Sequence, residues 1–353
     1  MNNRKIRVLV VDDSVVFRQL LVRGISSDPG IEVVAWASDP FDARDKILKY
    51  EPDVMTCDVE MPRMNGIEFI QKLMPQYPMP VVVVSSLSSA VFDAMNAGAV
   101  DFVNKPEKGS AKNVDSFINE LIIKIKTAAL SNIRAKKLNQ DLENARGGGL
   151  SSVNSGYRPG NVNDTRLIAI GASTGGTEAI YSILRCLPPS VPGIVIVQHI
   201  PPGFSRMFAE RLNNSTQLKV REAQSGEYIE NGCVFVAPGD AHLRVKKVGA
   251  RFKTEVFHGE KVSGHCPSAD VLFESVAKEC GKNAVGIILT GMGYDGAKGL
   301  LAMRRSGART IGQDEKSCVV YGMPKVAFNI GAVEKQVSLT DIPGTLFSML
   351  AQD

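Results

Sequence analysis

The sequence has few cysteines and little excess charge, and each shortage excludes a class of protein. It contains six cysteines, and the closest two, Cys266 and Cys280, lie 14 residues apart. No Cys-x-x-Cys pair is therefore present, which argues against a structural zinc site or a dithiol redox site. The 41 lysines and arginines face 37 acidic residues, and a formal net charge of +4 does not indicate a nucleic-acid-binding surface.

Long apolar runs are also missing. Runs such as residues 81–84 and 194–197 are far shorter than the roughly 20 residues that a membrane-spanning helix needs. The polar start passes directly into an apolar run at residues 6–11, which leaves no room for a secretory signal. We therefore expect a cytoplasmic protein with reduced thiols and no direct membrane insertion.

Short β-rich runs alternate with helical patterns along most of the chain, which predicts α/β architecture with mostly parallel sheets. The runs are continuously apolar, as expected for strands covered by helices on both faces. Residues 227–257 are richer in strands and hairpins. The predicted strands are residues 6–11, 33–37, 54–57, 81–85 and 100–104, then 167–170, 194–198, 234–237, 285–290 and 310–312.

The two alternating regions are separated by a segment of different composition. A long helical pattern covers roughly residues 114–145, and Gly, Ser and Asn then dominate residues 147–156. Such a composition cannot bury enough apolar surface to order itself, which predicts a flexible linker. We expect a first domain at residues 1–126, a linker at 127–164 and a second, doubly wound domain at 165–353.

Charged residues follow three strands of the first region. Asp12 and Asp13 follow the first strand, Asp58 the third and Lys105 the fifth. Because carboxyl ends of parallel strands meet at one sheet edge, we expect these side chains to gather there. Three carboxylates repel one another unless a cation lies among them, and an all-oxygen ligand set suits Mg²⁺. Carboxylates, a divalent ion and an ammonium group are what phosphoryl transfer onto an aspartate needs.

The segments that carry these residues resemble the receiver domain of bacterial two-component response regulators. The resemblance covers about residues 5–125 and implies a flavodoxin-like, five-stranded parallel sheet. It implies Asp58 as the phosphoacceptor and a Mg²⁺ site formed by Asp12, Asp13, Asp58 and the backbone oxygen of Glu60. The matching segments are residues 10–14 (VVDDS), 57–66 (CDVEMPRMNG) and 102–106 (FVNKP).

The same resemblance implies a switch beside the phosphoacceptor. Ser85 would supply the hydroxyl that follows the phosphoryl group, with the adjacent Ser86 as the alternative. Phe102 would be the coupled aromatic residue, Lys105 the fixed positive charge, and the bond between Lys105 and Pro106 a cis peptide.

A glycine-rich turn opens the second region. A predicted strand at residues 167–170 runs into Gly171-Ala172-Ser173-Thr174-Gly175, which has the G-x-S-x-G spacing of a nucleophile elbow. Backbone N–H groups at the start of the following helix could stabilise an oxyanion. A dinucleotide-binding loop is the alternative, but it would usually have an acid after the second strand, where Gln198 and His199 stand.

A serine nucleophile requires a base, and two histidines compete for that role. His199 follows the second strand of this region at the same predicted edge as Ser173, whereas His265 precedes a helix. Asp295 follows another strand and a glycine-rich loop. It is either a helix N-cap or the carboxylate that orients the base.

These segments resemble the catalytic domain of the chemotaxis-specific protein-glutamate methylesterases, the CheB family. The resemblance covers about residues 165–350 and implies Ser173, His199 and Asp295 as a catalytic triad. Tyr294 stands where relatives often carry Asn. The matching segments are residues 170–177 (IGASTGGT), 198–204 (QHIPPGF), 237–240 (APGD), 267–273 (PSADVLF), 289–297 (LTGMGYDGA) and 318–324 (CVVYGMP).

The CheB resemblance implies an activity and two partners. The activity is hydrolysis of glutamate methyl esters on the cytoplasmic domain of methylated chemoreceptors, and deamidation of specific glutamines, with no cofactor for the hydrolase. The phosphodonor would be a chemotaxis histidine kinase, and the receiver would gate the active site. Two rival functions, a DNA-binding response regulator and a dinucleotide-dependent oxidoreductase, are disfavoured by the α/β output region and by the missing acid.

Overall fold

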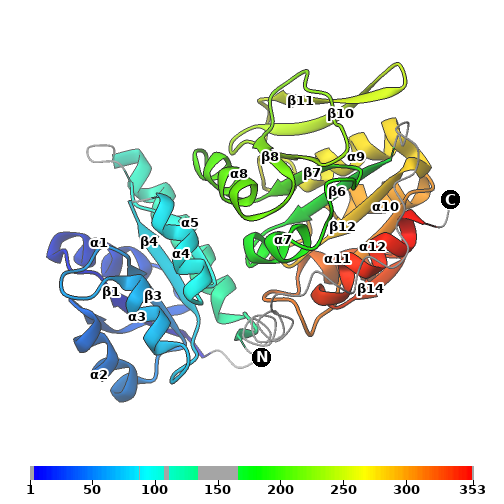
Figure 1. Ribbon diagram of the computed structural model, residues 1–353. Coiled ribbons are helices and arrows are strands. Elements are labelled where there is room, and N and C mark those ends of the chain that lie inside the picture. Colours follow the sequence, from blue (N-terminus) through cyan, green and yellow to red (C-terminus); the bar gives the residue numbers. More distant parts are fainter. Residues whose placement is uncertain (1–3, 87, 107–110, 134–165, 352–353) are drawn as a thin grey trace. The chain divides into compact units, whose positions relative to one another are not determined.

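The computed structural model describes residues 4–86, 88–106, 111–133 and 166–351 (Figure 1). The chain divides into two compact units, Met1–Arg134 and Ala135–Asp353. Most of the linker predicted at residues 127–164 lies outside the described residues. Within the described ranges, no helix combines the length and the apolarity that crossing a membrane requires.

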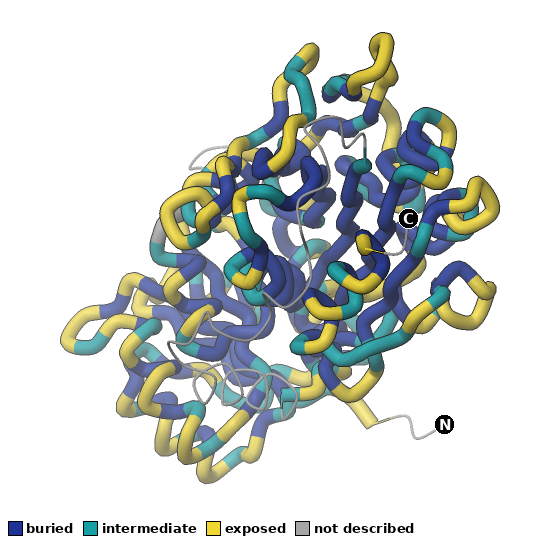
Figure 2. Tube along the Cα trace, turned by 45° about the vertical axis from the view of Figure 1, so that its right-hand side comes forward, coloured by how far each residue is buried: buried dark blue, intermediate teal, exposed yellow. Residues whose placement is uncertain are grey.

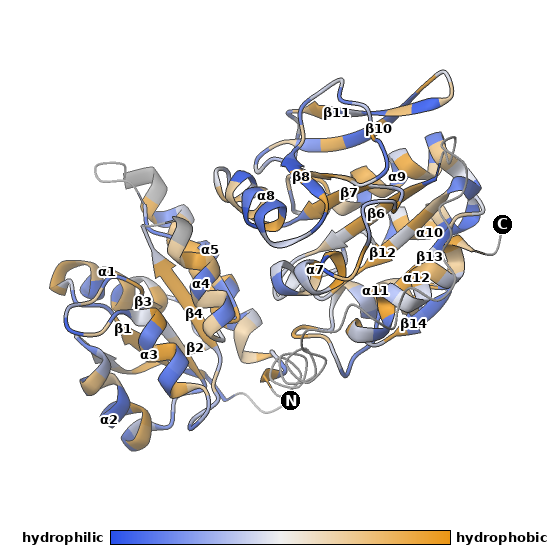
Figure 3. Cartoon of the chain, in the orientation of Figure 1, coloured by the Kyte–Doolittle hydropathy of each residue, from blue (hydrophilic) through white to orange (hydrophobic). Residues whose placement is uncertain are grey.

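The first unit has five parallel strands in the order β2-β1-β3-β4-β5, which confirms the predicted sheet. Its strands are mostly buried and apolar, and helices lie on both sides of the sheet (Figures 1 and 3). The strands are β1 (Ile6–Val11), β2 (Ile31–Ala37), β3 (Val54–Asp58), β4 (Val81–Ser85) and β5 (Asp101–Asn104). The helices are α1 (Val15–Ile25), α2 (Pro40–Tyr50), α3 (Gly66–Leu73), α4 (Ser88–Ala97) and α5 (Ala111–Ala129).

Local sequence signals set where the helices beside the strand ends begin. Ser14 caps α1, its hydroxyl accepting a hydrogen bond from the Phe17 N–H at 3.4 Å. Asn65 caps α3 in the same way through the Glu68 N–H at 2.8 Å. A Cβ at Gly66 would lie 2.0 Å from the Asp58 carbonyl oxygen, so only glycine lets α3 start against the end of β3.

The second unit has seven parallel strands in the order β14-β13-β12-β6-β7-β9-β8, beside an antiparallel hairpin of β10 and β11. The burial of its central strands is visible in Figure 2. The strands are β6 (Leu167–Ala172), β7 (Gly193–Gln198), β8 (Lys219–Glu222), β9 (Cys233–Val236), β10 (His242–Val248), β11 (Arg251–Phe257), β12 (Ala284–Ile288), β13 (Arg309–Gln313) and β14 (Lys335–Val337). The helices are α7 (Gly176–Leu184), α8 (Phe204–Ser215), α9 (Ala269–Cys280), α10 (Ala297–Arg305), α11 (Met323–Asn329) and α12 (Ile342–Leu350), with short 3₁₀ turns at Gly281–Asn283 and Leu339–Asp341.

The order of the strands fixes where each sheet can hold a site. In the first sheet β1 lies between β2 and β3, and in the second β6 lies between β7 and β12. Successive crossovers leave these central strands in opposite directions, and at such switch points the loops diverge and open a crevice at the carboxyl edge. The residues that follow β1 and β3, and those that follow β6, β7 and β12, therefore lie at the carboxyl edges next to these switch points.

The structure departs from the predicted elements in two respects. The long helix expected at residues 114–145 is wrong in extent, because α5 spans Ala111–Ala129. Its last turn is closed by bonds from the Leu130 and Ser131 N–H groups to carbonyls three residues back. Strands β8 and β14 were not predicted, because both are short, partly exposed edge strands without a continuous apolar run.

Candidate active site and receiver carboxylates

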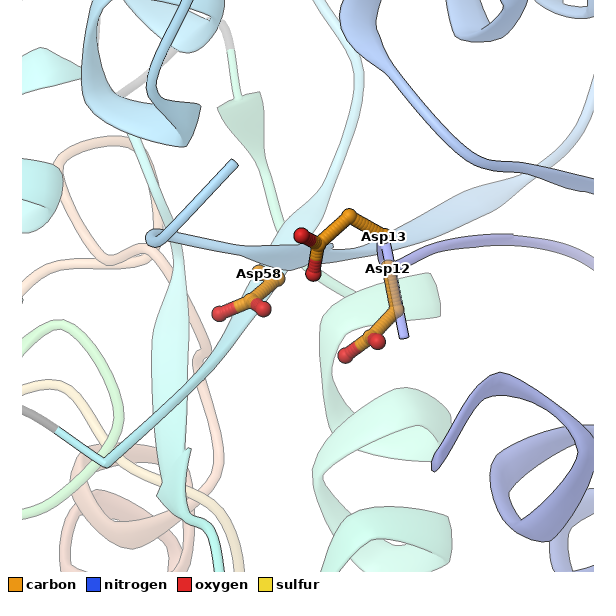
Figure 4. A group of neighbouring side chains, drawn as sticks. All are labelled: Asp12, Asp13 and Asp58. Atoms are coloured by element: carbon orange, nitrogen blue, oxygen red, sulfur yellow. The ribbon is translucent and has the colours of Figure 1, made fainter. Parts of the chain in front are cut away.

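Three aspartates gather at the carboxyl edge of the first sheet. Asp12 and Asp13 follow β1 and Asp58 ends β3, and one carboxylate oxygen from each lies within 4.8 Å of the others (Figure 4). Asp12 and Asp58 are buried, whereas Asp13 is exposed. Lys105 Nζ lies 3.0 Å from Asp12 Oδ2 and 2.6 Å from Asp58 Oδ2. The predicted grouping of these four residues is therefore what the structure shows.

Burial and the clustering of carboxylates both disfavour the ionised forms of these aspartates. Burial raises the pKa of Asp12 above its ordinary value of 3.8, although Lys105 and the Ser14 N–H oppose the shift. Burial likewise raises the pKa of Asp58, with Asp12 adding to the shift and Lys105 opposing it. Burial would lower the pKa of Lys105, but the two carboxylates outweigh it and raise that pKa. One ammonium group therefore does not compensate the cluster.

The donor set fits a magnesium ion. All three acidic side chains supply carboxylate oxygens, which are the ligands that Mg²⁺ prefers. Asp12 and Asp58 are both buried and share one ammonium group, so a further positive charge would favour their ionised forms. The first unit thus has the acidic cluster that is typical of a Mg²⁺ site.

The remaining predicted receiver residues lie on adjoining strands and loops. Ser85 is buried at the end of β4, whereas Ser86 is exposed and its hydroxyl donates to Glu60 Oε2 at 3.1 Å. Phe102 is buried on β5, next to β4, with its ring 6.5 Å from that of Phe92. The Glu60 N–H donates to Asp58 Oδ1 at 3.2 Å, so the backbone of Glu60 adjoins the acidic cluster.

The expected cis peptide between Lys105 and Pro106 is not present. The single cis peptide among the described residues, which include both of these, is Cys266–Pro267. The trans form before proline is favoured by about 0.5–1 kcal/mol. Lys105 reaches both buried carboxylates in this form, and its N–H donates to the Ser85 carbonyl oxygen at 3.0 Å.

Ser173 lies directly after β6, in a turn that requires glycine at position 175. Its N–H donates to the Thr290 carbonyl oxygen at 3.0 Å, and its own carbonyl oxygen accepts from Gln198 Nε2 at 2.9 Å. Gly175 has φ +78°, and a Cβ there would meet the Val319 side chain at 2.7 Å. A Cβ at Gly291 would lie 2.6 Å from the Ser173 Cβ, so the loop after β12 passes close against the serine.

His199 and Asp295 meet at the same edge. The His199 N–H donates to the Ala172 carbonyl oxygen at 3.1 Å, which places the histidine beside the residue before Ser173. His199 Nε2 lies 2.8 Å from Asp295 Oδ2, and both side chains are buried. His199 Nδ1 is buried without a hydrogen-bond partner. The structure therefore pairs the histidine with the carboxylate, whereas the Ser173 hydroxyl makes no hydrogen bond to Nδ1.

Asp295 caps a helix, but not the one that follows it. The N-cap of α10 is Gly296, whereas the Asp295 carboxylate lies at the N-terminus of α9. There it accepts from Ser268 Oγ at 2.7 Å and from the N–H groups of Ala269 and Asp270 at 2.7 and 3.1 Å. Burial would raise the pKa of Asp295, but these donors and His199 outweigh it and hold the pKa below 3.8.

The other histidines have different surroundings. His265, the competing base in the sequence, lies against His199, with ring centroids 3.7 Å apart and planes 8° apart. His242 is buried, with Nε2 on the Glu260 carbonyl oxygen and Nδ1 accepting from the Ser268 N–H. His258 is exposed, and its Nδ1 lies 3.1 Å from the Asp240 carbonyl oxygen. His199 is therefore the histidine whose ring nitrogen lies against the Asp295 carboxylate.

Ser268 is the site residue that sequence reasoning missed. It caps α9 and also donates to Asp295, so a single hydroxyl couples the start of a helix to the buried carboxylate. The sequence carried a signal, because Ser268 stands at the start of a helical pattern after Pro267. That signal predicts a cap, but it does not reveal which distant carboxylate the cap touches.

Two family models match the chain, one for each unit. The model described as CheB methylesterase matches residues 168–346, and that of the response regulator receiver domain matches residues 8–112. The pairing defines a receiver-containing α/β protein with a methylesterase-type output region.

Curated relatives match over their whole length. A protein-glutamate methylesterase/protein-glutamine glutaminase 2 of Syntrophomonas wolfei is 55% identical over 353 residues, covering 100% of both chains. A protein-glutamate methylesterase/protein-glutamine glutaminase of Salmonella typhimurium is 47% identical, covering 98% of this chain and 97% of its own. The crystal structure of the Thermotoga maritima CheB methylesterase catalytic domain matches with a TM-score of 0.51 and 35% identity, covering 52% of this chain and 98% of that one. The chain belongs to the CheB methylesterase family.

Proposed function

We propose that this protein removes methyl groups from glutamate side chains of chemoreceptors and deamidates specific receptor glutamines, under the control of its receiver domain. Family membership at about half identity over the full length supports a protein-glutamate methylesterase and protein-glutamine glutaminase. The cytoplasmic domain of a methylated chemoreceptor is the proposed substrate. Both reactions are acyl transfers from a side-chain carbonyl to water, so one site can perform them.

The proposed chemistry proceeds through an acyl-enzyme on Ser173. The Ser173 oxygen bonds to the ester carbonyl carbon while its proton passes to His199 Nδ1. The carbon–methoxy bond then breaks, and the proton leaves with methanol. Water then adds to the acyl carbon, and His199 again takes its proton. The bond to the Ser173 oxygen breaks, that oxygen receives the proton back from His199, and the glutamate carboxylate is released. On a glutamine, ammonia replaces methanol as the leaving group.

Asp295 would act on this reaction without exchanging a proton. Its oxygen, 2.8 Å from His199 Nε2, fixes the tautomer in which Nε2 carries hydrogen and Nδ1 can accept one. It also stabilises the imidazolium that forms when Nδ1 is protonated. This buried pair, beside the turn that carries Ser173, is the observation that carries the proposed mechanism.

Replacing the nucleophile tests this mechanism directly. Ser173→Ala should lower methanol release from a methylated receptor fragment by at least about 10⁴-fold, because no other group can form the acyl-enzyme. A fluorophosphonate probe should label the parent chain and not this variant. Ser348→Ala, on the exposed face of α12, is the matched control and should behave like the parent. Near-normal turnover by Ser173→Ala would refute the assignment.

We propose that the first unit is the phosphorylation switch, with Asp58 as the phosphoacceptor. A chemotaxis histidine kinase is the proposed phosphodonor. Asp12, Asp13, Asp58 and the Glu60 backbone oxygen would hold Mg²⁺, which supplies neutralisation of the phosphoryl oxygens when bound. Lys105, 2.6 Å from the Asp58 carboxylate, would neutralise the remaining charge.

The readout of the switch would lie on β4 and β5, which follow β3 in the order of the sheet. In the proposal, the Ser85 hydroxyl follows the phosphoryl group and Phe102 changes its packing with it. This coupling would gate access to the hydrolase crevice by shifting a conformational population. The proposed domain limits are residues 1–126 and 165–353, joined by a linker at 127–164.

A further inference from the structure

A single hydrogen bond does not fix the orientation of the His199 ring. Nε2 is held by Asp295, but Nδ1 is buried and has no hydrogen-bond partner. A ring held through one nitrogen can still tilt about that contact. For a base that must meet a hydroxyl hydrogen along the nitrogen lone pair, such a tilt is costly, since misplacement by about 1 Å can reduce a rate about 100-fold.

The His199 ring also stacks against the ring of His265. The two imidazole centroids are 3.7 Å apart, and the planes differ by only 8°. This is a face-to-face stack at van der Waals distance, so tilting His199 out of its plane would press it into His265. The stack restrains the degree of freedom that the bond to Asp295 leaves open.

The segment that carries His265 is itself held firmly. Val262 and His265 exchange two backbone hydrogen bonds, both of 3.0 Å, around a two-residue turn. Ser263 has φ +51° and Gly264 φ +85°, which is the backbone of a tight type I′ turn. The Ser263 hydroxyl also donates to Asp270 Oδ2 at 2.8 Å, which ties the turn to α9.

The same segment supports the other partner of His199. Three residues after His265, Ser268 caps α9 and donates to Asp295. Residues 263–268 therefore hold both the ring that covers His199 and the carboxylate that bonds to it. A displacement of this segment would disturb the plane and the tautomer of the base together.

We propose that His265 is a positioning residue, whose ring stacks on His199 and holds the imidazole in the plane needed to accept the Ser173 proton. This inference rests on the proposed role of His199 as the base. It assigns to His265 no proton transfer and no contact with the substrate. A flat aromatic ring, and not an ionisable one, is the feature that the role requires.

The test compares His265→Ala with His265→Phe in the full chain. Methanol release from a methylated receptor fragment gives kcat and KM, and the rate of Ser173 labelling by a fluorophosphonate gives nucleophile activation without a receptor. His265→Ala should lower kcat and the labelling rate about 10- to 100-fold with KM within about twofold. His265→Phe, which keeps a ring of similar plane, should recover most of the loss. His258→Ala, at an exposed histidine of the same unit, is the matched control.

The outcomes separate a positioning role from a merely structural one. If His265→Ala keeps kcat and the labelling rate within about twofold of the parent, the inference is wrong, while labelling of Ser173 would leave the proposed function intact. If His265→Phe is as impaired as His265→Ala at an unchanged unfolding temperature, the stack is not what matters and the inference is again wrong. Should His265→Ala fail to fold, the His265→Phe variant alone decides. Absence of labelling in the parent would count against the proposed function itself.

Discussion

Asp58 in the first unit and Asp295 in the second both lie at the carboxyl edge of a parallel sheet, and both are buried, with 3% and 1% of their surface exposed. Their surroundings have opposite effects. Asp58 lies with two other carboxylates and one ammonium group, and burial raises its pKa. Asp295 receives hydrogen bonds from His199, Ser268 and two backbone N–H groups, which outweigh burial and lower its pKa.

The contrast shows that the sheet topology determines where a site lies, and that the side chains and N–H groups around each carboxylate determine its chemistry. Both groups of residues lie where central strands send their connections in opposite directions. In the first, burial raises the pKa of Asp12 and Asp58, and a bound cation would favour their ionised forms. In the second, a helix N-terminus and a hydroxyl satisfy the carboxylate in advance, so it stays ionised next to a histidine. The first group of carboxylates is typical of a cation site, whereas the Asp295 carboxylate already has hydrogen-bond donors from the protein.

The largest expected effect comes from neutralising Asp295. Asp295→Asn should lower methyl-ester hydrolysis on the order of 10⁴-fold, because an amide favours the wrong tautomer of His199 and cannot stabilise the imidazolium. Methanol release under saturating receptor fragment is the measurement. Asp341→Asn, at an exposed position, should leave the rate unchanged. A rate within tenfold of the parent would show that Asp295 does not orient the base.

Neutralising Asp58 should leave basal hydrolysis intact and remove its stimulation by phosphorylation. Asp58→Asn cannot accept a phosphoryl group, so stimulation by a small phosphodonor with Mg²⁺ should disappear. Basal methanol release should stay within about twofold of the parent, since the change lies in the other unit. A variant that still responded to the phosphodonor would place the phosphoacceptor elsewhere.

The sequence allowed prediction of those residues whose position follows from a strand end. Asp12, Asp58 and Lys105 were grouped correctly because the carboxyl ends of parallel strands share an edge. His199 was placed at the edge with Ser173 by the same argument, and its backbone does adjoin Ala172. Strand ends are encoded locally, by an apolar run and the polar residue that ends it.

Features that depend on contacts between distant segments could not be predicted. Nothing near Asp295 in the sequence indicates that Ser268 donates to it, because the pairing arises from how α9 packs beside the loop after β12. The stack of His265 on His199 has the same origin, and the sequence presented these two histidines as competitors. The end of α5 at Ala129 was missed because the helical pattern in the sequence continues beyond it.

A smaller effect should follow from supplying the cation. A Mg²⁺ concentration ten times its Kd should stabilise the first unit by about 1.4 kcal/mol, because the ion binds the folded carboxylates and not the unfolded chain. Thermal unfolding with and without Mg²⁺ measures the shift, expected to be on the order of 5 °C. Asp13→Asn, which removes an exposed ligand oxygen, should reduce the shift, whereas Asp45→Asn should not. An equal shift in both variants would argue against the acidic cluster as the site.

The smallest effect concerns acid stability and has opposite signs for two neighbouring aspartates. The pKa of Asp295 is lower in the folded state than its ordinary value of 3.8, so the unfolded chain binds the proton more readily. The stability that Asp295 contributes is therefore present above about pH 4 and is lost as the pH falls through the folded pKa. Burial raises the pKa of Asp270, so its contribution is present at low pH and is lost as the pH rises through that raised pKa.

Denaturant unfolding between pH 5 and pH 3 separates the two, because histidines remain protonated in the unfolded chain throughout that range. The difference in unfolding free energy between the parent and Asp295→Asn should shrink as the pH falls. The unfolding free energy of the parent should rise relative to that of Asp270→Asn as the pH falls. Parallel trends in the two variants would mean that the N–H donors at the start of α9 do not lower the pKa of Asp295 relative to that of Asp270. These donors would then not explain the contrast between Asp295 and the receiver aspartates.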